Sequence, residues 1–194
     1  MKQINKLLKK IRSNNVNSEE DTLEIWDEQL AELGSKIIKK RLKVIDKLKI
    51  LARLNQRKIT EGKENLTIEY ENSIKTNINE IDDLKVIFKQ DLVNNRNKEI
   101  ERGYTITGPH RDDLILQINN KDVRKYGSQG QQRTVALSLK LAELEFMKSE
   151  IGEYPILLLD DVFSELDNER KNTLIEVIKD NIQTIITSTN FNDL

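Results

Sequence analysis

A run of mostly aliphatic residues that ends in two adjacent carboxylates constrains the fold of this chain more than any other stretch. From Pro155 to Asp167 it reads PILLLDDVFSELD. A continuous apolar run of this length predicts a strand that is buried on both faces of a parallel sheet. Asp160 and Asp161 would then lie at the carboxyl end of that strand, where open α/β sheets place their ligands. Two charges there need a partner, and Mg²⁺ on a nucleotide phosphate fits, with a simple loop cap as the alternative.

A glycine-containing helix start lies upstream of this run. Residues Tyr126 to Thr134 read YGSQGQQRT, and the residues from Val135 to Ser149 have a helical pattern. Backbone N–H groups at the start of a helix, the helix dipole and the Ser128 hydroxyl together favour an anion. Such a helix start is common by itself. Because an amphipathic helix, the strand with its two carboxylates and a second acidic turn follow it, it predicts one side of a nucleotide site.

The loop that cradles the β- and γ-phosphates in many nucleotide sites is not found in this sequence. No stretch of the 194 residues matches GxxxxGK[ST], and none of the seven glycines precedes a Lys-Ser or Lys-Thr pair. The sequence therefore predicts half of a nucleotide site. We expect this chain by itself neither to bind ATP tightly nor to hydrolyse it.

The order of these motifs resembles the second half of an ABC-type ATPase head of the SMC class, in which a signature, a Walker B strand and a D-loop follow one another. Three stretches closely resemble the RecF family: GPHRDD at 108–113, YGSQGQQRTVALSLKLAELE at 126–145 and EYPILLLDDVFSELD at 153–167. The resemblance runs from about Asp21, through the similar segment Ile25 to Ala31, to Thr189. It implies a Walker A segment before residue 1, so we expect a C-terminal fragment that lacks the Walker A lobe.

The resemblance implies an α/β fold, namely the C-terminal part of an ABC/SMC-type P-loop ATPase head with a long-helix arm. It implies ATP and Mg²⁺ as ligands, with Asp160 serving the metal and Asp161 polarising the water that attacks ATP. The signature would contact the γ-phosphate of an ATP held by another subunit, and the D-loop would touch that subunit. The signature residues are Ser128, Gln129, Gly130 and Gln131, and the D-loop residues are Ser164, Glu165, Leu166 and Asp167.

The function implied by the resemblance is that of an ATP-dependent, DNA-binding recombination mediator in DNA repair, DNA replication and the SOS response. The expected partners are gapped DNA (single- or double-stranded), a second copy in an ATP-dependent dimer, and recombination mediators such as RecR. The complete protein is expected to be a slow ATPase in the cytoplasm. Two alternatives stay open: the head of another SMC-like ATPase, and a protein-interaction module without enzymatic activity. Against the former, the residues between Asp21 and Ile100 are too few for a long coiled coil.

Composition excludes several classes of site. The chain has no cysteine, which rules out disulfides and Cys-ligated metal sites and suits a reducing cytoplasm. No apolar run approaches the roughly 20 residues of a membrane span, and the basic N-terminus has no apolar core of a signal peptide. The formal net charge is −1, so any contact with DNA must come from a local patch.

Residues 1–101 are predicted to form a helical arm of two long helices with a short strand between them. Apolar residues from Leu23 to Leu54 recur at helical spacing and predict one helix that ends near Arg57. Acidic residues fill the beginning of this helix, and ten basic residues crowd the rest. The helix dipole explains part of this arrangement, but its effect fades within one turn. The excess of positive charge therefore favours a phosphate-binding surface, for which the candidates are Lys39, Lys40 and Lys43.

Shorter elements are predicted around these helices. A strand is expected from Leu66 to Tyr70, and a second helix through Ile74, Ile78, Ile81, Leu84, Phe88 and Leu92. Residues 102–194 are predicted to form the C-terminal ATPase lobe, with strands at 104–107, 114–118 and 184–188, a tight turn at Asn119-Asn120 and a helix at 168–180. His110 is the single histidine. Together with Asp112 and Asp113 it could hold a metal, and a structural loop is the alternative.

Overall fold

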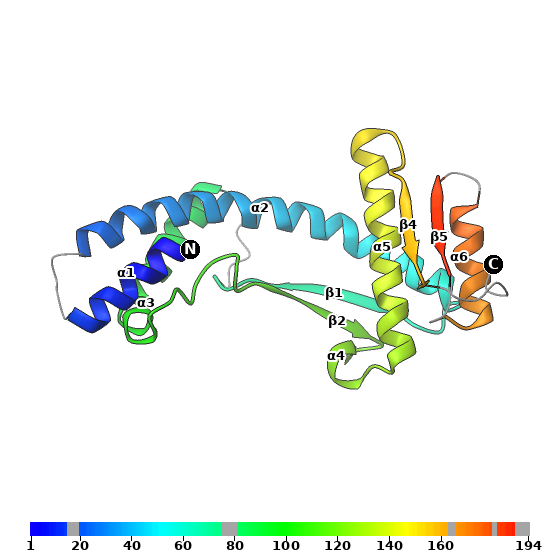
Figure 1. The fold of residues 1–194 in the computed structure, drawn as a ribbon, viewed down its shortest axis with the longest axis horizontal. Coiled ribbons are helices and arrows are strands. Elements are labelled where there is room, and N and C mark those ends of the chain that lie inside the picture. The colour runs from blue at the N-terminus through cyan, green and yellow to red at the C-terminus, as the bar shows by residue number, and fades with distance from the viewer. Residues whose placement is uncertain (15–19, 75–80, 163–165, 180–181, 189–194) are drawn as a thin grey trace. The chain divides into compact units, whose positions relative to one another are not determined.

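The structure is a computed structural model that describes residues 1–14, 20–74, 81–162, 166–179 and 182–188. The described elements, in chain order, are α1 (Lys2–Asn14), α2 (Glu20–Ile59), β1 (Leu66–Glu71), α3 (Ile81–Arg102), β2 (Asp113–Ile118), β3 (Lys121–Asp122), α4 (Val123–Tyr126), α5 (Gln129–Ile151), β4 (Leu157–Asp160), α6 (Asn168–Ile178) and β5 (Thr184–Thr187) (Figure 1). The mixture of helices with a parallel strand pair agrees with the predicted α/β class. None of the described helices is both long and apolar enough to cross a bilayer.

Contacts divide the chain into two compact units. The first contains Met1–Lys43 and Tyr70–Leu114, and the second contains Val44–Glu69 and Ile115–Leu194. The first part of α2 packs with α1 and α3, whereas its last part packs with α5, so a single helix contributes to both units. This division differs from the predicted ranges 1–101 and 102–194, which stay a prediction.

The first unit is built on two neighbouring apolar clusters. In one of them, α1 inserts Ile4, Leu8 and Ile11 against Leu23 of α2. In the other, α2 packs against α3 and against Ile74, which follows β1; the buried side chains are Ala31, Ile38, Ile74, Leu84, Phe88 and Leu92. The predicted long helix is confirmed and runs unbroken over 40 residues. Gly34 lets α3 come close, because a Cβ at this position would lie 2.2 Å from Cε1 of Phe88.

Two predictions for the first unit are wrong in detail. The second helix begins at Ile81, so Ile74 lies before it, buried near the end of β1, and Ile78 lies outside the described residues. Residues 104–107 do not form a strand. Their backbone donors are taken by side chains instead: Thr105 N donates to Asn5 Oδ1 at 3.1 Å, and Ile106 N donates to Glu99 Oε1 at 2.7 Å. Because these amides already donate to side chains, they are not available for hydrogen bonds to a neighbouring strand.

A small sheet with the order β1-β2-β3 contains the predicted hairpin. β2 and β3 pair antiparallel, with Gln117 opposite Asp122 and Ile118 opposite Lys121. Asn119 and Asn120 both have positive φ, at 48° and 65°, as a two-residue hairpin turn of type I′ requires. The tight turn predicted from the two asparagines is confirmed.

The core of the second unit lies on one face of the parallel pair β4-β5. Leu157 and Leu159 pack there with α5 and α6, together with Leu137, Leu141, Leu144, Leu166, Leu174 and Ile178. The prediction of a strand buried on both faces is wrong for the described residues, because Ile156 and Leu158 on the opposite side are 58% and 69% exposed. β4 has β5 as its one described strand neighbour, and the two helices cover a single face.

Candidate functional site

The signature residues form the start of α5, six residues earlier than the helical pattern indicated. Ser128 is the N-cap: its Oγ accepts from Gln131 N at 3.2 Å, while its own N–H donates to Gln131 Oε1 at 3.0 Å. This reciprocal pair is a capping box, and the first turn contains no acidic residue. The predicted helix start is confirmed. Two of its backbone donors are already bonded within the protein, so they are not free as expected.

The side chain of Gln131 ties this helix start to the end of α2. Its Nε2 donates to Glu64 Oε1 at 3.0 Å, and the other oxygen of Glu64 accepts from Gln56 Nε2 at 2.6 Å. Gln56 Oε1 in turn accepts from Ser138 Oγ, further along α5, at 2.8 Å. Gln56 and Ser138 are fully buried, so a buried polar network with paired members positions the signature.

The two carboxylates lie at the carboxyl ends of the parallel strands, where the sequence placed them. Asp160 is paired in register with Thr187 of β5, and its exposed carboxylate accepts from the Thr187 Oγ1 at 2.6 Å. Asp161 follows with a φ of 50°, a left-handed conformation that Asp and Asn tolerate better than most residues. Its N–H donates to Thr187 O at 3.1 Å. The two side chains therefore leave the strand from different backbone conformations, which gives them different surroundings.

Part of the predicted D-loop can be described. Ser164 and Glu165 lie outside the described residues, whereas Leu166 is buried in the core of the second unit. Asp167 caps α6: its Oδ1 accepts from Arg170 N at 2.9 Å, and its Oδ2 pairs with Arg170 Nη1 at 2.7 Å. Asp167 is thus the N-cap of α6. A contact of this segment with another subunit stays a prediction.

Arg170 is a site residue that sequence reasoning missed. A Cβ at position 130 would lie 3.4 Å from its Nη1 and 3.9 Å from Ser128 Oγ, so the starts of α5 and α6 are adjacent. The Asp-Arg spacing of three residues signals the pair with Asp167. The approach to Gly130 depends on tertiary packing and has no sequence signal. A helix N-terminus, a hydroxyl and a guanidinium in one place suit an anion.

The basic residues of α2 do not all face the same way. Lys39, Lys40 and Lys43 are exposed, and among the residues that the structure describes none of them forms an ion pair. Arg41 instead reaches the GPHRDD segment, where its Nη1 donates to Pro109 O and lies 3.3 Å from Asp112 Oδ2. The three lysines therefore remain candidates for a phosphate contact, and Arg41 has a structural role.

The GPHRDD segment is held by Asp112, whose side chain is 1% exposed. Besides Arg41, its carboxylate accepts from Tyr70 OH and from Ser73 N. Burial first, and then this hydrogen bond, raise the pKa of Tyr70 to about 12. His110 turns to Thr105 instead, and burial lowers its pKa. No cluster of three metal-ligating side chains occurs within the described ranges. The separate hydrogen bonds of Asp112 and His110 to protein groups favour the loop interpretation of this segment.

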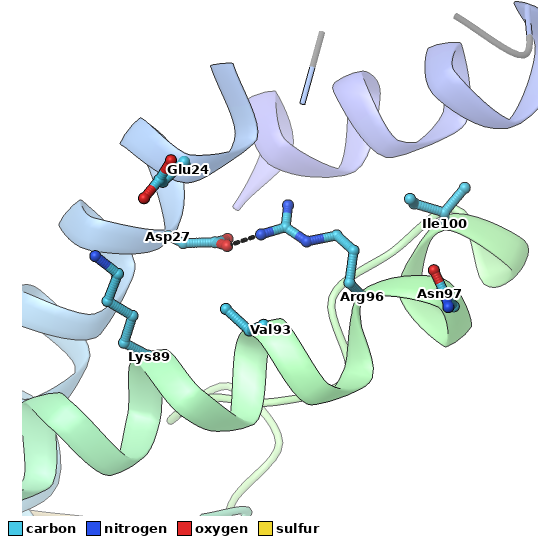
Figure 2. A pocket seen from close by; sticks show the side chains of 7 residues that line it. All are labelled: Glu24, Asp27, Lys89, Val93, Arg96, Asn97 and Ile100. Carbon is cyan, nitrogen blue, oxygen red and sulfur yellow. Dashed lines mark hydrogen bonds and ion pairs between the residues drawn. The ribbon is translucent and has the colours of Figure 1, made fainter. Parts of the chain in front are cut away.

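A cavity of about 390 Å³ lies beside α2 and α3 in the first unit (Figure 2). Its lining is mixed, with Glu24, Asp27, Lys89, Val93, Arg96, Asn97 and Ile100. Asp27 is buried and pairs with Arg96 across the cavity wall. Burial raises the pKa of Asp27 against the opposing effect of Arg96. None of the predicted site residues lines this cavity.

The signature helix, the carboxylates at the strand ends and the long helix belong to a fold that matches solved structures of the ABC/SMC-type ATPase class over about half of their length, so the fold class is the C-terminal part of such a head with a long-helix arm. The relatives are DNA replication and repair proteins called RecF. That of Halothermothrix orenii is 60% identical over 196 residues, which cover 100% of this chain and 52% of the relative. That of Alkaliphilus oremlandii is 53% identical over 193 residues, which cover 97% of this chain and 52% of the relative.

Solved structures agree with the sequence relatives. The structure of the recombination mediator protein RecF-ATPrS in the RecFOR pathway matches 100% of this chain and 51% of its own, with a TM-score of 0.86 at 40% identity. The corresponding RecF-ATP structure matches with a TM-score of 0.84. No family model matches the chain. The resemblance to the RecF family is confirmed, and the chain spans about half the length of the curated relatives it matches.

Proposed function

We propose that this chain supplies one side of a composite ATP site in a RecF-type mediator of DNA recombination and repair. The observation that carries the proposal is the match along the whole chain to solved structures named for RecF with ATP and ATPrS. The adjacent starts of α5 and α6, with Ser128 and Arg170, support an anion site at the signature. Roles in DNA replication and in the SOS response belong to the same proposal.

The residues of the two motifs have separate proposed roles in binding and hydrolysing ATP. Ser128, Gln129, Gly130 and Gln131 would hold the γ-phosphate of an ATP bound mainly by another subunit. Asp160 suits Mg²⁺, because its exposed carboxylate and the Thr187 hydroxyl are the hard oxygen groups that this ion takes. Asp161 would polarise the attacking water. Ser164, Glu165, Leu166 and Asp167 would form the D-loop against the other subunit.

The phosphate-binding loop of the proposed site would come from outside the 194 residues. The printed sequence has no Walker A pattern, and the relatives are about twice as long as the matched region. We propose that the Walker A loop comes from the part of the protein outside this match. ATP would then be bound between two copies and would stabilise their dimer by mass action. Hydrolysis would release that dimer.

Ser128→Arg tests this arrangement in a protein that has the full length of its relatives. The larger side chain would enter the space for the opposing γ-phosphate, so ATP should bind the monomer nearly as before while the ATP-driven dimer is lost. Light scattering with a non-hydrolysable ATP analogue measures the dimer. Ser149→Arg, at the exposed far end of the same helix, is the matched control. Normal dimers of Ser128→Arg would overturn binding in trans.

DNA, gapped or otherwise, is the proposed partner of the first unit, and RecR is a proposed protein partner. Lys39, Lys40 and Lys43 offer unpaired positive charge within the described structure of α2. Their contacts would go to phosphates and would not depend on sequence.

A further inference from the structure

The helix α1 carries positive charge without any compensating acid of its own. Its 13 residues, KQINKLLKKIRSN, include five basic and no acidic side chains. Its apolar residues Ile4, Leu8 and Ile11 face the core of the first unit. Lys2, Lys6 and Lys9 recur at spacings of four and three, so they form one row on the opposite, exposed side.

The row is open to a ligand in the part of the chain that the structure describes. Lys2, Lys6 and Lys9 are all exposed, and no described acidic group forms an ion pair with them. By contrast, two other lysines of the first unit are paired, Lys36 with Glu32 at 2.8 Å and Lys89 with Glu28 at 2.9 Å. The positive charge of the α1 row is therefore not used within the fold.

A fixed guanidinium lies on the segment that packs beside this row. The aliphatic stem of Lys9 lies against Gly103, where a Cβ would come within 2.9 Å of its Cγ. Asn5 on the same helix accepts from Thr105 N at 3.1 Å. On this segment, Arg111 donates from Nε and Nη2 to Thr105 O at 3.1 and 2.8 Å, and it stacks 4.9 Å from the centre of the Tyr104 ring. Arg111 is thus an exposed cation with a restricted orientation.

We propose that Lys2, Lys6, Lys9 and Arg111 form a binding surface for the phosphate backbone of nucleic acid. The row from Lys2 to Lys9 is about 10 Å long at ~1.5 Å per residue. A duplex presents one negative charge per about 1.7 Å of its axis, so such a row can neutralise several phosphates. The inference rests on the proposed function and adds a surface on α1 to the lysines of α2.

The composition of the surface favours nucleic acid over an acidic protein. Protein interfaces have an apolar centre that is depleted in lysine. The exposed positions of α1 after Met1 are instead polar or basic: Lys2, Gln3, Lys6, Lys9, Lys10, Arg12 and Ser13. If the experiment below shows that DNA binding is unaffected by changes in this surface, an acidic protein would become the favoured partner.

The test replaces Lys2, Lys6 and Lys9 with Gln together and compares this variant with Lys98→Gln, Lys140→Gln and Lys179→Gln combined. The control lysines are exposed and lie on α3, on α5 and at the end of α6, and both triple variants change the net charge equally. Binding to labelled single-stranded and duplex DNA is followed by fluorescence anisotropy over a salt series. The α1 variant should bind on the order of tenfold more weakly at low salt, and its slope of log K against log salt should be shallower by about two to three units.

The outcomes separate this inference from the proposed function. If the unmodified protein binds no DNA, the proposed function fails together with the inference. If it binds DNA and the α1 variant keeps the same affinity and slope, the inference alone is overturned. An equal loss in both triple variants would be a net-charge effect and would also overturn it. Arg111→Gln, expected to lower the slope by close to one unit, tests the fourth cation separately.

Discussion

At the scale of single residues, the two carboxylates at the end of β4 are neighbours for which we propose different roles. Asp160 belongs to the strand and accepts from the Thr187 hydroxyl at 2.6 Å. Asp161 leaves the strand with a φ of 50°. A carboxylate fixed at the strand end suits a metal, whereas the one in the following turn is the proposed group that polarises water for attack on ATP.

In a protein that has the full length of its relatives, Asp161→Asn should separate nucleotide binding from hydrolysis. Asn tolerates the left-handed conformation as Asp does, so the turn should survive. The amide cannot take a proton, and hydrolysis should fall by the roughly 10²–10⁴-fold typical of a lost general base. Phosphate release measures hydrolysis, and equilibrium dialysis measures ATP binding, which should persist. Asp160→Asn is the matched change and should weaken both. If Asp161→Asn keeps normal hydrolysis while Asp160→Asn loses it, the two roles are reversed.

Replacing Asp112 should lower the free energy of unfolding and leave ATP binding unchanged. Its buried carboxylate accepts from Tyr70, Ser73 and Arg41. Asp112→Ala would leave these donors without their acceptor, and breaking such a buried ionic group costs about 3–5 kcal/mol. Urea unfolding followed by circular dichroism gives the free energy. Asp113→Ala, one residue further at an exposed position, should cost less than about 1 kcal/mol. Equal losses in the two variants would refute the role of Asp112.

At the scale of elements, the start of α5 depends on a residue from the loop after α2. Glu64 holds Gln131, whose amide closes the cap on Ser128. Glu64→Ala should therefore loosen the first turn of α5. Losing about 1 kcal/mol of hydrogen bonding corresponds to roughly fivefold faster amide exchange there. Hydrogen exchange with mass spectrometry measures this rate. Glu153→Ala, exposed on the same unit, should leave it unchanged, and an unchanged rate in Glu64→Ala would show that the cap is independent of α2.

Glu99, near the end of α3, should make stability depend on pH. It is 3% exposed, and burial raises its pKa above the ordinary value of 4.5. The hydrogen bonds that its carboxylate accepts from backbone amides lower the pKa, but burial has the larger effect. The folded state therefore holds this proton more tightly than the unfolded state. This contribution to stability is full below pH 4.5 and is lost as the pH rises through the folded pKa.

Glu99→Gln isolates this effect because the amide oxygen can still accept from Ile106 N. Relative to the natural protein, the variant should therefore be more stable at pH 7 than at pH 4. Its free energy of unfolding should exceed that of the natural protein by more at pH 7. Urea unfolding at the two pH values measures the difference, and Glu101→Gln at the exposed end of the helix is the control. A difference that does not change with pH would contradict the raised pKa.

The elements that sequence could predict are those fixed by local chemistry. The apolar spacing along α2, the two asparagines of the hairpin and the helix start near Ser128 are read within a few residues. The strand predicted at 104–107 does not form because the amide of Thr105 donates to the side chain of Asn5 on α1. Arg170 was missed because its place beside Gly130 is set by the packing of α6 and not by any local pattern.

At the scale of the whole molecule, charge is balanced overall and uneven locally. The chain has 32 basic and 33 acidic residues, so no general field attracts nucleic acid. Local excess occurs on α1 and in the middle of α2, both within the first unit up to Lys43. Affinity for DNA would therefore come from these surfaces, and it should depend strongly on salt.

The α2 surface is tested by replacing Lys39, Lys40 and Lys43 together with Gln. If each lysine binds a phosphate, duplex DNA of any sequence should bind more weakly by a similar factor. The slope of log K against log salt should become shallower by about 0.9 for each phosphate that the variant no longer neutralises. Fluorescence anisotropy over a salt series measures both quantities, with the Lys98, Lys140 and Lys179 triple as the control for net charge. Circular dichroism should show an intact fold, because all three α2 lysines are exposed. An unchanged slope would leave the basic run of α2 explained by the helix dipole and solvation alone.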